Sequence, residues 1–259
     1  MNYLTAVLIL LAVVGFSRQD INYCSPQLCP NGITHVACNG SSLLASSCGA
    51  GSEEIIMDEA KIKLIVRLHN ELRSKVATGK QIYAPGKTYP QASRMATLQW
   101  SPELATVAAS NARRCVYGHD QCHNTEEFKY AGQNIAQLSF QGMTMSDSDL
   151  IDGFIYAWFS EYIHANPNII ARFPKHYSGP MIGHFTQMIS DRATRIGCAV
   201  VSYNSGAWIR KYFVCNYSLA NIIDQGVYEK GMACSRCRTG CNPKYPGLCN
   251  VHEPISSHP

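Results

Sequence analysis

Apolar residues recur at three- and four-residue steps in three stretches of the chain, which is the spacing of one face of a helix. The first stretch runs from about Asp58, its expected N-cap, to Val76 and ends at Gly79. The second begins at Ser101-Pro102-Glu103, where a hydroxyl cap precedes a proline and an acid in the first turn. The third runs from about Asp149 to His164, and Asn166-Pro167 is expected to end it.

Two later stretches have the composition of β-strands. Residues 196–203 and 207–217 are rich in β-branched and aromatic side chains, and Asn204-Ser205-Gly206 between them is typical of a hairpin turn. This hairpin would bring Cys198 and Cys215 close together. Helices interleaved with an antiparallel sheet predict a layered α+β domain over residues 58–222.

The segments outside this domain lack sustained periodicity. Residues 1–17 form a short apolar run that ends in Gly15-Phe16-Ser17, which predicts a signal peptide cleaved before Arg18, although the run is preceded by no Lys or Arg. Residues 18–57 and 223–259 are expected to form a cysteine-rich N-terminal extension and a cysteine-rich C-terminal tail. No later segment is apolar enough to predict a transmembrane span.

Cysteine content places the chain in an oxidising compartment. An even number of cysteines, twelve, in an exported chain indicates a disulfide framework and a secreted, extracellular protein. Their spacing alone leaves the pairing open. The formal net charge of +4, without a dense run of Lys and Arg, is too small to indicate a nucleic-acid partner.

Several motifs together resemble one family. They are Gly183-His184-Phe185-Thr186-Gln187-Met188, Cys215-Asn216-Tyr217, His119-Asp120-Gln121-Cys122 and Gly132-Gln133-Asn134-Ile135-Ala136. With these motifs the chain resembles the CAP superfamily (cysteine-rich secretory protein, antigen 5 and pathogenesis-related 1), and within it the insect antigen 5 or venom allergen type. The resemblance covers almost the whole mature chain and extends to Asn22-Tyr23-Cys24, His35-Val36-Ala37-Cys38, His69-Asn70-Glu71-Leu72-Arg73 and Trp158-Phe159-Ser160-Glu161.

This resemblance implies a fold and a set of disulfide bonds. The fold is an α-β-α sandwich, the CAP (SCP) domain. The four tail cysteines, Cys234, Cys237, Cys241 and Cys249, would pair among themselves; their spacing also fits a zinc knot, but an oxidising compartment favours disulfides. The other implied pairs are Cys24 with Cys38, Cys29 with Cys122, Cys48 with Cys115, and Cys198 with Cys215.

The resemblance also implies a central cleft with two histidines and two acids, at positions His119, Gln133, Glu161 and His184. Gln133 stands where many family members carry glutamate, and an amide cannot act as a carboxylate base. His119, Glu161 and His184 are candidate ligands of zinc or another divalent metal, with a fourth position left to water. The alternative is that both histidines are hydrogen-bonded structural residues with Glu161 as a partner. No cofactor is required by either reading.

The expected function is binding. The chain has no Gly-x-Ser-x-Gly elbow and no His-Glu-x-x-His helix, so we expect a non-enzymatic monomer. By resemblance, its partner is a small hydrophobic ligand such as a lipid or sterol, or an extracellular protein receptor. An apolar slot between the helices of residues 62–76 and 150–162 is one candidate site; core packing of these faces is the alternative. The alternative functions are a metal-dependent cleft with weak hydrolase or protease activity, and an extracellular signalling protein of venom, saliva or reproductive fluid.

Two further polar features are distinguished by their position. Asn39-Gly40-Ser41 and Asn216-Tyr217-Ser218 are glycosylation sequons, and we expect only Asn39 to carry a glycan, because Asn216 lies in a predicted strand beside Cys215. His69 lies on the apolar face of the first helix and is expected to be a hydrogen-bonded core residue rather than a ligand.

Overall fold

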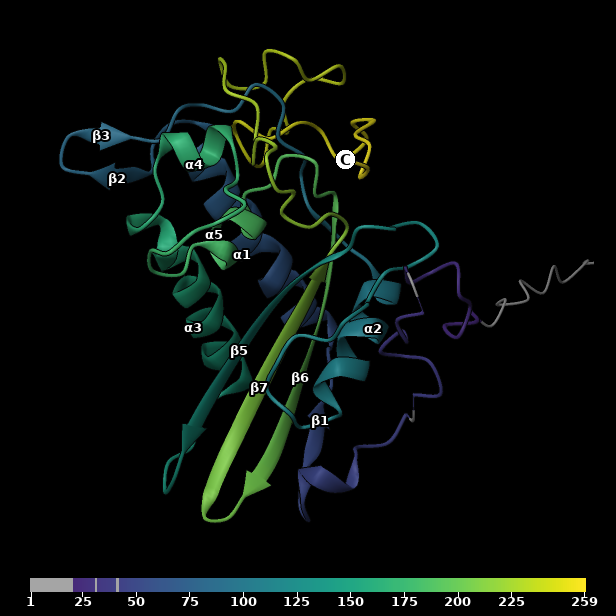
Figure 1. The fold of residues 1–259 in the computed structure, drawn as a ribbon. Helices are drawn as coiled ribbons and strands as arrows, with labels where there is room; N and C mark the ends of the chain where they lie inside the picture. Colours follow the sequence, from purple (N-terminus) through teal and green to yellow (C-terminus); the bar gives the residue numbers. More distant parts are fainter. Residues whose placement is uncertain (1–20, 31, 41) are drawn as a thin grey trace, which may run out of the picture.

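The computed structural model describes residues 21–30, 32–40 and 42–259. The predicted signal peptide lies outside these residues. Figure 1 shows a central sheet with α1 and α3 on one face and α2 on the other, which confirms the α+β sandwich. Within the described residues, no helix is long and apolar enough to cross a bilayer.

Two of the three predicted helix starts are confirmed by their capping bonds. Helix α1, Glu59–Ala77, begins after Asp58, whose carboxylate accepts a hydrogen bond from the backbone N–H of Lys61 at 2.9 Å. Helix α2, Pro102–Ala112, begins after Ser101, whose hydroxyl accepts from Leu104 N. The chain leaves α1 through Gly79, which has a φ of +69°.

The third predicted helix is shorter than expected and starts earlier. Helix α3 spans Asp147–Ser160 with Ser146 as its cap, and a 3-10 turn, η2 (Glu161–Ile163), follows it. Asn166 does not end α3; its side chain instead caps a new short helix, α4 (Pro167–Ala171), because proline fits the first turn of a helix. Helix α5, Gly183–Met188, was not predicted.

Five strands form the main sheet. The hairpin of β6 (Arg195–Ser205) and β7 (Trp208–Tyr217) has Cys198 directly opposite Cys215, as predicted. Strand β5 (Gly132–Phe140) pairs with β7 at one edge, and β1 (Glu53–Ile55), from the N-terminal extension, pairs with β6. Strand β4 (Gln99–Trp100) runs parallel to β6. A small separate hairpin, β2 (Ile82–Ala84) and β3 (Lys87–Thr88), lies outside this sheet, and a 3-10 turn, η1, spans Ser46–Cys48.

Alternation along the strands divides the interior into two cores. Side chains on one face of the sheet, such as Phe213 and Val200, pack with α1, α3 and α5. Side chains on the opposite face, such as Val214 and Tyr212, pack against the small residues Ala108 and Ala112 of α2. Each face of the sheet is therefore covered, and β5 lies at one edge of the sheet.

All twelve cysteines form disulfides, and the four pairs that the resemblance implies are present. Cys29–Cys122 and Cys48–Cys115 tie the N-terminal extension to the segment after α2. The tail cysteines pair among themselves. The complete set is Cys24–Cys38, Cys29–Cys122, Cys48–Cys115, Cys198–Cys215, Cys234–Cys241 and Cys237–Cys249.

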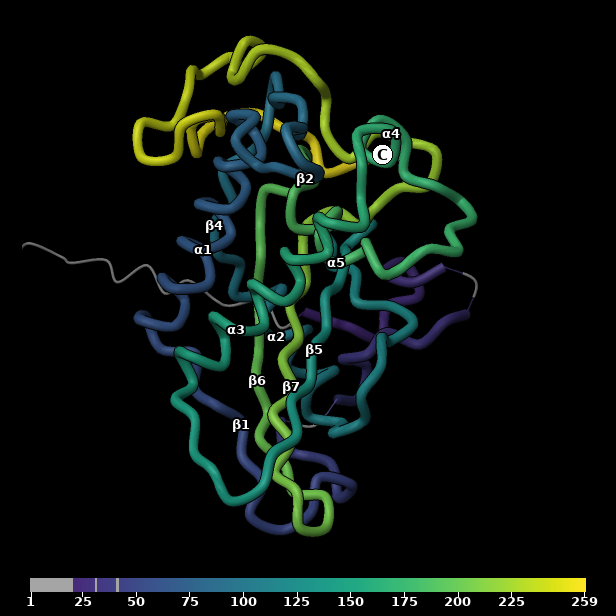
Figure 2. Tube along the Cα trace, turned by 90° about the vertical axis from the view of Figure 1, so that its left-hand side faces the viewer, coloured from purple at the N-terminus to yellow at the C-terminus, as the bar shows by residue number. Residues whose placement is uncertain are grey.

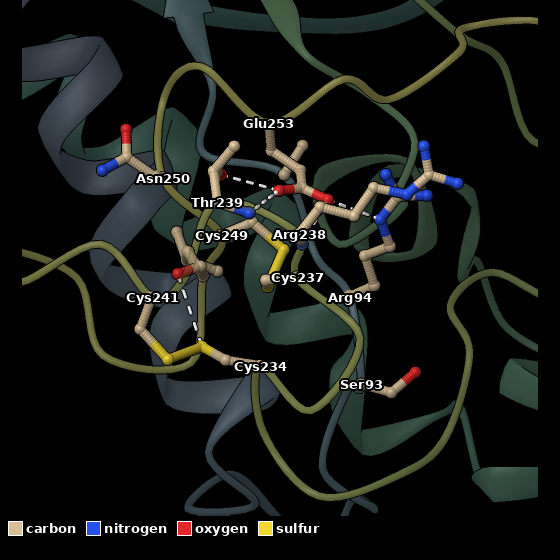
Figure 3. The surroundings of a disulfide bond; sticks show 12 residues. Ser93, Arg94, Cys234, Cys237, Arg238, Thr239, Cys241, Cys249, Asn250 and Glu253 are labelled. Atoms are coloured by element: carbon tan, nitrogen blue, oxygen red, sulfur yellow. Dashed lines mark hydrogen bonds and ion pairs between the residues drawn. A yellow bond between two sulfur atoms is a disulfide. The ribbon is translucent and has the colours of Figure 1, made fainter.

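The cysteine-rich tail is held on the domain by a buried carboxylate. Figure 3 shows Glu253 beside the Cys237–Cys249 disulfide, with its oxygens facing Thr239 and Arg94. It accepts hydrogen bonds from the backbone N–H of Arg238 and Thr239, from the Thr239 hydroxyl, and from Arg94 Nε at 2.7 Å. Burial alone would raise the pKa of Glu253, but these hydrogen bonds lower it to about 2.

Tail side chains also belong to the main core. Leu248 and Tyr245 join the cluster that contains α1 and α3, and Leu248 is fully buried. Figure 2 shows the tail, in yellow, lying across the end of the molecule where α1 and the β2–β3 hairpin meet. The tail therefore covers one end of the main hydrophobic core.

Candidate functional site

The structure arranges the four cleft positions as two hydrogen-bonded pairs. In the first pair, His119 Nδ1 lies 2.8 Å from Gln133 Oε1. His119 is exposed in the segment after α2, whereas Gln133 is half-buried near the start of β5. The Gln133 amide nitrogen donates to Asp120 Oδ2 at 2.8 Å and to Asn216 Oδ1 at 3.0 Å.

In the second pair, Glu161 holds His184 at the start of α5. His184 Nδ1 lies 2.6 Å from Glu161 Oε1, and Glu161 Oε2 accepts from the backbone N–H groups of His184 and Phe185. The carboxylate thus satisfies free N–H groups of a helix that has no side-chain cap of its own. The Trp158 ring stacks on His184 at a centroid distance of 5.9 Å.

The Cys215-Asn216-Tyr217 motif supports both pairs from β7. Asn216 contacts Gln133, while the Tyr217 hydroxyl lies 2.9 Å from His69 Nε2 and accepts from Asn134 Nδ2. His69 is fully buried and its Nδ1 bonds to Ile65 O, so the prediction of a satisfied core histidine is confirmed. Burial lowers the pKa of His69 to about 4.

The two pairs approach the edge strand from opposite faces. Gln133 and Asn134 are consecutive on β5, so their side chains project to opposite sides. Gln133 contacts His119 on the α2 side; Asn134 donates to the backbone carbonyl of His184 on the α5 side. This alternation explains how one edge strand supports both histidines.

These residues do not form the hypothesised three-ligand metal site. Across residues 21–259, leaving aside 31 and 41, no group of three or more His, Cys, Asp or Glu side chains is arranged to hold a metal ion. Both oxygens of Glu161 are already bonded to His184 and Phe185, so this carboxylate acts as a positioning partner. Two imidazoles remain as donors, which is fewer than the three protein ligands of a typical catalytic zinc site.

The apolar slot predicted between the two long helices is closed. The facing side chains, such as Leu68 and Leu72 of α1 and Ile151 and Ile155 of α3, are buried in one core cluster. The alternative reading, core packing, is correct for these positions.

An apolar groove lies instead between α1, β4 and the tail, and we call it the α1–tail groove. Its volume is about 1030 Å³, at the upper end of the roughly 300–1,000 Å³ of pockets that bind small ligands. Apolar side chains from four segments line it; the buried or half-buried ones are Ile62, Val66, Leu98, Trp100 and Tyr245, and Val251 is exposed at its rim. Three cations, Lys63, Arg67 and Lys244, also line it, and the first two are paired with Glu59 and Glu71.

The two sequons differ in exposure. Asn39 is exposed in the N-terminal extension, and Ser41 of its sequon lies outside the described residues. Asn216 is fully buried against Gln133, which leaves a glycosyl transferase no access in the folded protein.

Two residues beside the site were missed by sequence reasoning. Asp120 and His123 lie within or next to the His119 motif, and they form an ion pair at 2.6 Å with side chains that are 3% and 14% exposed. The position of Asp120 directly after His119 was the signal in the sequence that could have pointed to its role. Only the fold shows that it reaches Gln133, which lies 13 residues further along the chain.

Comparison with known protein families gives one match over most of the domain. Residues 66–217 match the family model described as the cysteine-rich secretory protein family, CAP. This range contains all four cleft positions and both strands of the long hairpin.

Curated relatives match over nearly the whole chain. Venom allergen-1 of Aedes aegypti is 44% identical over 236 residues, which is 91% of this chain and 90% of the relative. Antigen 5 like allergen Cul n 1 of Culicoides nubeculosus is 37% identical, covering 80% of this chain and 93% of the relative.

Solved structures share the fold. The crystal structure of NaASP2 with Zn2+ superposes with a TM-score of 0.64 at 29% identity, covering 75% of this chain and 97% of that chain. The structure of BmVAL-1 gives the same TM-score at 27% identity, covering 74% of this chain and 95% of that chain.

Proposed function

The chain belongs to the CAP family of cysteine-rich secretory proteins, among the insect venom allergens and antigen 5 proteins, and from this we propose a secreted protein that acts by binding, not catalysis. Six disulfides support the secreted location, because such a framework persists in oxidising compartments. The domain division into extension, CAP domain and tail, and the glycan on Asn39, are part of this proposal.

The cleft chemistry supports the choice of binding. The partner of His119 is the neutral amide of Gln133, which cannot take up a proton as a general base does. Since all twelve cysteines are bonded, no thiol is available as a nucleophile.

The α1–tail groove carries the proposal of a small hydrophobic ligand, such as a lipid or sterol. Its apolar wall is built from α1, β4 and the tail, which are far apart in sequence, so only the complete fold forms it. Ile62 and Val66 of α1 keep part of their surface in solvent, and covering such surface is worth about 25 cal/mol per Å². A ligand that fills the groove would gain this free energy.

The test is lipid analysis of the protein secreted from insect cells, followed by titration with a fluorescent fatty acid and a fluorescent sterol. We expect Val66→Asp to weaken binding by about tenfold or more, since the charge would be buried under the ligand. Ile56→Asp is the matched control, because Ile56 is 79% exposed and lies outside the groove. Protein that carries no lipid and takes up neither probe would refute the small-ligand proposal and favour a protein receptor.

A further inference from the structure

A chain of hydrogen bonds connects His119 to an ion pair beneath it. His123 Nδ1 lies 2.6 Å from Asp120 Oδ1, Asp120 Oδ2 accepts from Gln133 Nε2 at 2.8 Å, and Gln133 Oε1 lies 2.8 Å from His119 Nδ1. The chain runs from a largely buried histidine to an exposed one. It lies apart from the α1–tail groove and does not depend on what that groove binds.

The buried end of the chain has fixed donors and acceptors. His123 Nε2 lies 3.0 Å from the carbonyl of Ala131 and its Nδ1 faces the Asp120 carboxylate. Both ring nitrogens of His123 therefore face an acceptor, and these two contacts fix the orientation of the ring against Asp120. Burial works to raise the pKa of Asp120, but hydrogen bonds from His123, Asn111 and Gln133 and the charge of His123 hold it far below the usual range.

The ionised carboxylate sets the direction of the Gln133 amide. Its NH₂ group faces Asp120 Oδ2 and Asn216 Oδ1, so its carbonyl oxygen faces His119. Asn216 does not fix the direction of the Gln133 amide, because Asn216 can match either orientation. Its Nδ2 is buried without a hydrogen-bond partner, so the Asn216 amide could turn over and donate to Gln133 where it now accepts. Asp120 is therefore the group that orients Gln133.

We propose that Asp120, paired with His123, and Gln133 are positioning residues that hold His119 in the Nδ1–H tautomer. The carbonyl of Gln133 only accepts, so His119 Nδ1 carries the proton and Nε2 keeps its lone pair at the surface. Nε2 then accepts a hydrogen bond from an O–H or N–H group of a ligand. Asp120 replaces the carboxylate that is missing at position 133, but it acts on His119 through the Gln133 amide, whereas Glu161 bonds to His184 directly.

The test is the two-bond proton–nitrogen NMR spectrum of the histidines in the ¹⁵N-labelled full-length mature protein at about pH 7.5, where exposed rings are neutral. Wild-type His119 should show protonated Nδ1. Asp120→Ala removes the acceptor of the Gln133 NH₂ group, so Gln133 can turn over and present its NH₂ to His119. The ratio of Nδ1–H to Nε2–H tautomer should then fall by about tenfold, the equivalent of one hydrogen bond to a charged group.

Restoration distinguishes positioning from general structural damage. In Asp120→Ala with Gln133→Glu, the new carboxylate only accepts, so the wild-type tautomer should return. Gln137→Glu is the control, because Gln137 lies on the same face of β5 but its Oε1 accepts from Tyr203. The signals of His69, fixed by Ile65 and Tyr217, report whether each variant is folded.

Two results would overturn the proposal: an unchanged His119 tautomer in folded Asp120→Ala, or no return of that tautomer in the double variant. If Asp120→Ala does not fold, Gln133→Met removes the carbonyl acceptor and leaves the contact between Asp120 and His123 in place. His119 should again lose its preference for the Nδ1–H tautomer, and an unchanged preference would contradict the proposed chain.

Discussion

His69 Nε2 lies 2.9 Å from the hydroxyl of Tyr217, which joins the middle of α1 to the last residue of β7. The carbonyl of Ile65 only accepts, so His69 Nδ1 carries a proton, and the Tyr217 hydroxyl also accepts from Asn134. Burial lowers the pKa of His69 to about 4, so the ring is neutral near pH 7 and its Nε2 accepts from the Tyr217 hydroxyl.

The neutral His69 predicts acid sensitivity. The folded-state pKa of about 4 lies below the ordinary 6.5, so the unfolded chain takes up this proton first as the pH falls from 6.5 towards 4. The free energy of unfolding should drop by about 3 kcal/mol over this range from His69 alone. Urea unfolding at several pH values should show a shallower slope in His69→Gln, which does not titrate; equal slopes would contradict the assignment.

Neutralising Glu253 should loosen the tail. Glu253→Gln retains the shape but loses the charge that accepts four hydrogen bonds, so we expect a loss of about 2 kcal/mol. Urea unfolding gives the loss, and limited proteolysis should cut the tail faster. The exposed Glu59→Gln, in a surface pair with Lys63, is the control and should leave the stability nearly unchanged. Similar values for both variants would show that Glu253 does not hold the tail.

Two glycines should respond oppositely to alanine. A Cβ on Gly197 of β6 would lie 2.2 Å from Ala105 N and 2.5 Å from Ser101 O, so Gly197→Ala should force α2 away and cost about 3 kcal/mol. Gly153 in α3 has open space around it, and Gly153→Ala should stabilise by about 0.5–1 kcal/mol. Thermal unfolding measures both; a stable Gly197→Ala would mean that α2 sits less tightly on the sheet.

Zinc should bind weakly at the cleft. With Glu161 engaged by α5 and an amide at position 133, two imidazoles are the donors left, and we expect a Kd above about 100 µM. Calorimetry at neutral pH is the measurement, with His119→Ala plus His184→Ala as the comparison. Saturable binding in the low micromolar range that disappears in the double variant would reverse this conclusion.

Local signals were sufficient for the elements that carry their own caps or turns. Asp58 and Ser101 cap helices as predicted, and the hairpin of β6 and β7 follows its turn residues. Strands β1 and β4 are two or three residues long, and the helix α5 is six. Such short elements form because β6 and Glu161 provide partners from distant parts of the chain.

The connections between the four cleft positions were only partly predicted. The resemblance gave the positions His119, Gln133, Glu161 and His184 and suggested Glu161 as a histidine partner; the structure pairs Glu161 with His184 and Gln133 with His119. The role of Asp120 depends on the register that places Gln133 opposite Asn216, and the α1–tail groove depends on where the tail folds back. Both relationships are contacts between segments that are distant in the chain, so the local spacing of apolar and polar residues does not predict them.

The order of the disulfides affects how the chain must oxidise. In a secreted chain, cysteines meet an oxidant in the order in which they leave the translocation channel, so neighbours such as Cys24 and Cys29 would be together first. Four of the six native bonds join cysteines that are not consecutive in the chain: Cys24–Cys38, Cys29–Cys122, Cys234–Cys241 and Cys237–Cys249. Mispaired intermediates must be reshuffled by thiolate attack, so the yield of native protein should depend on a disulfide isomerase in the expression host.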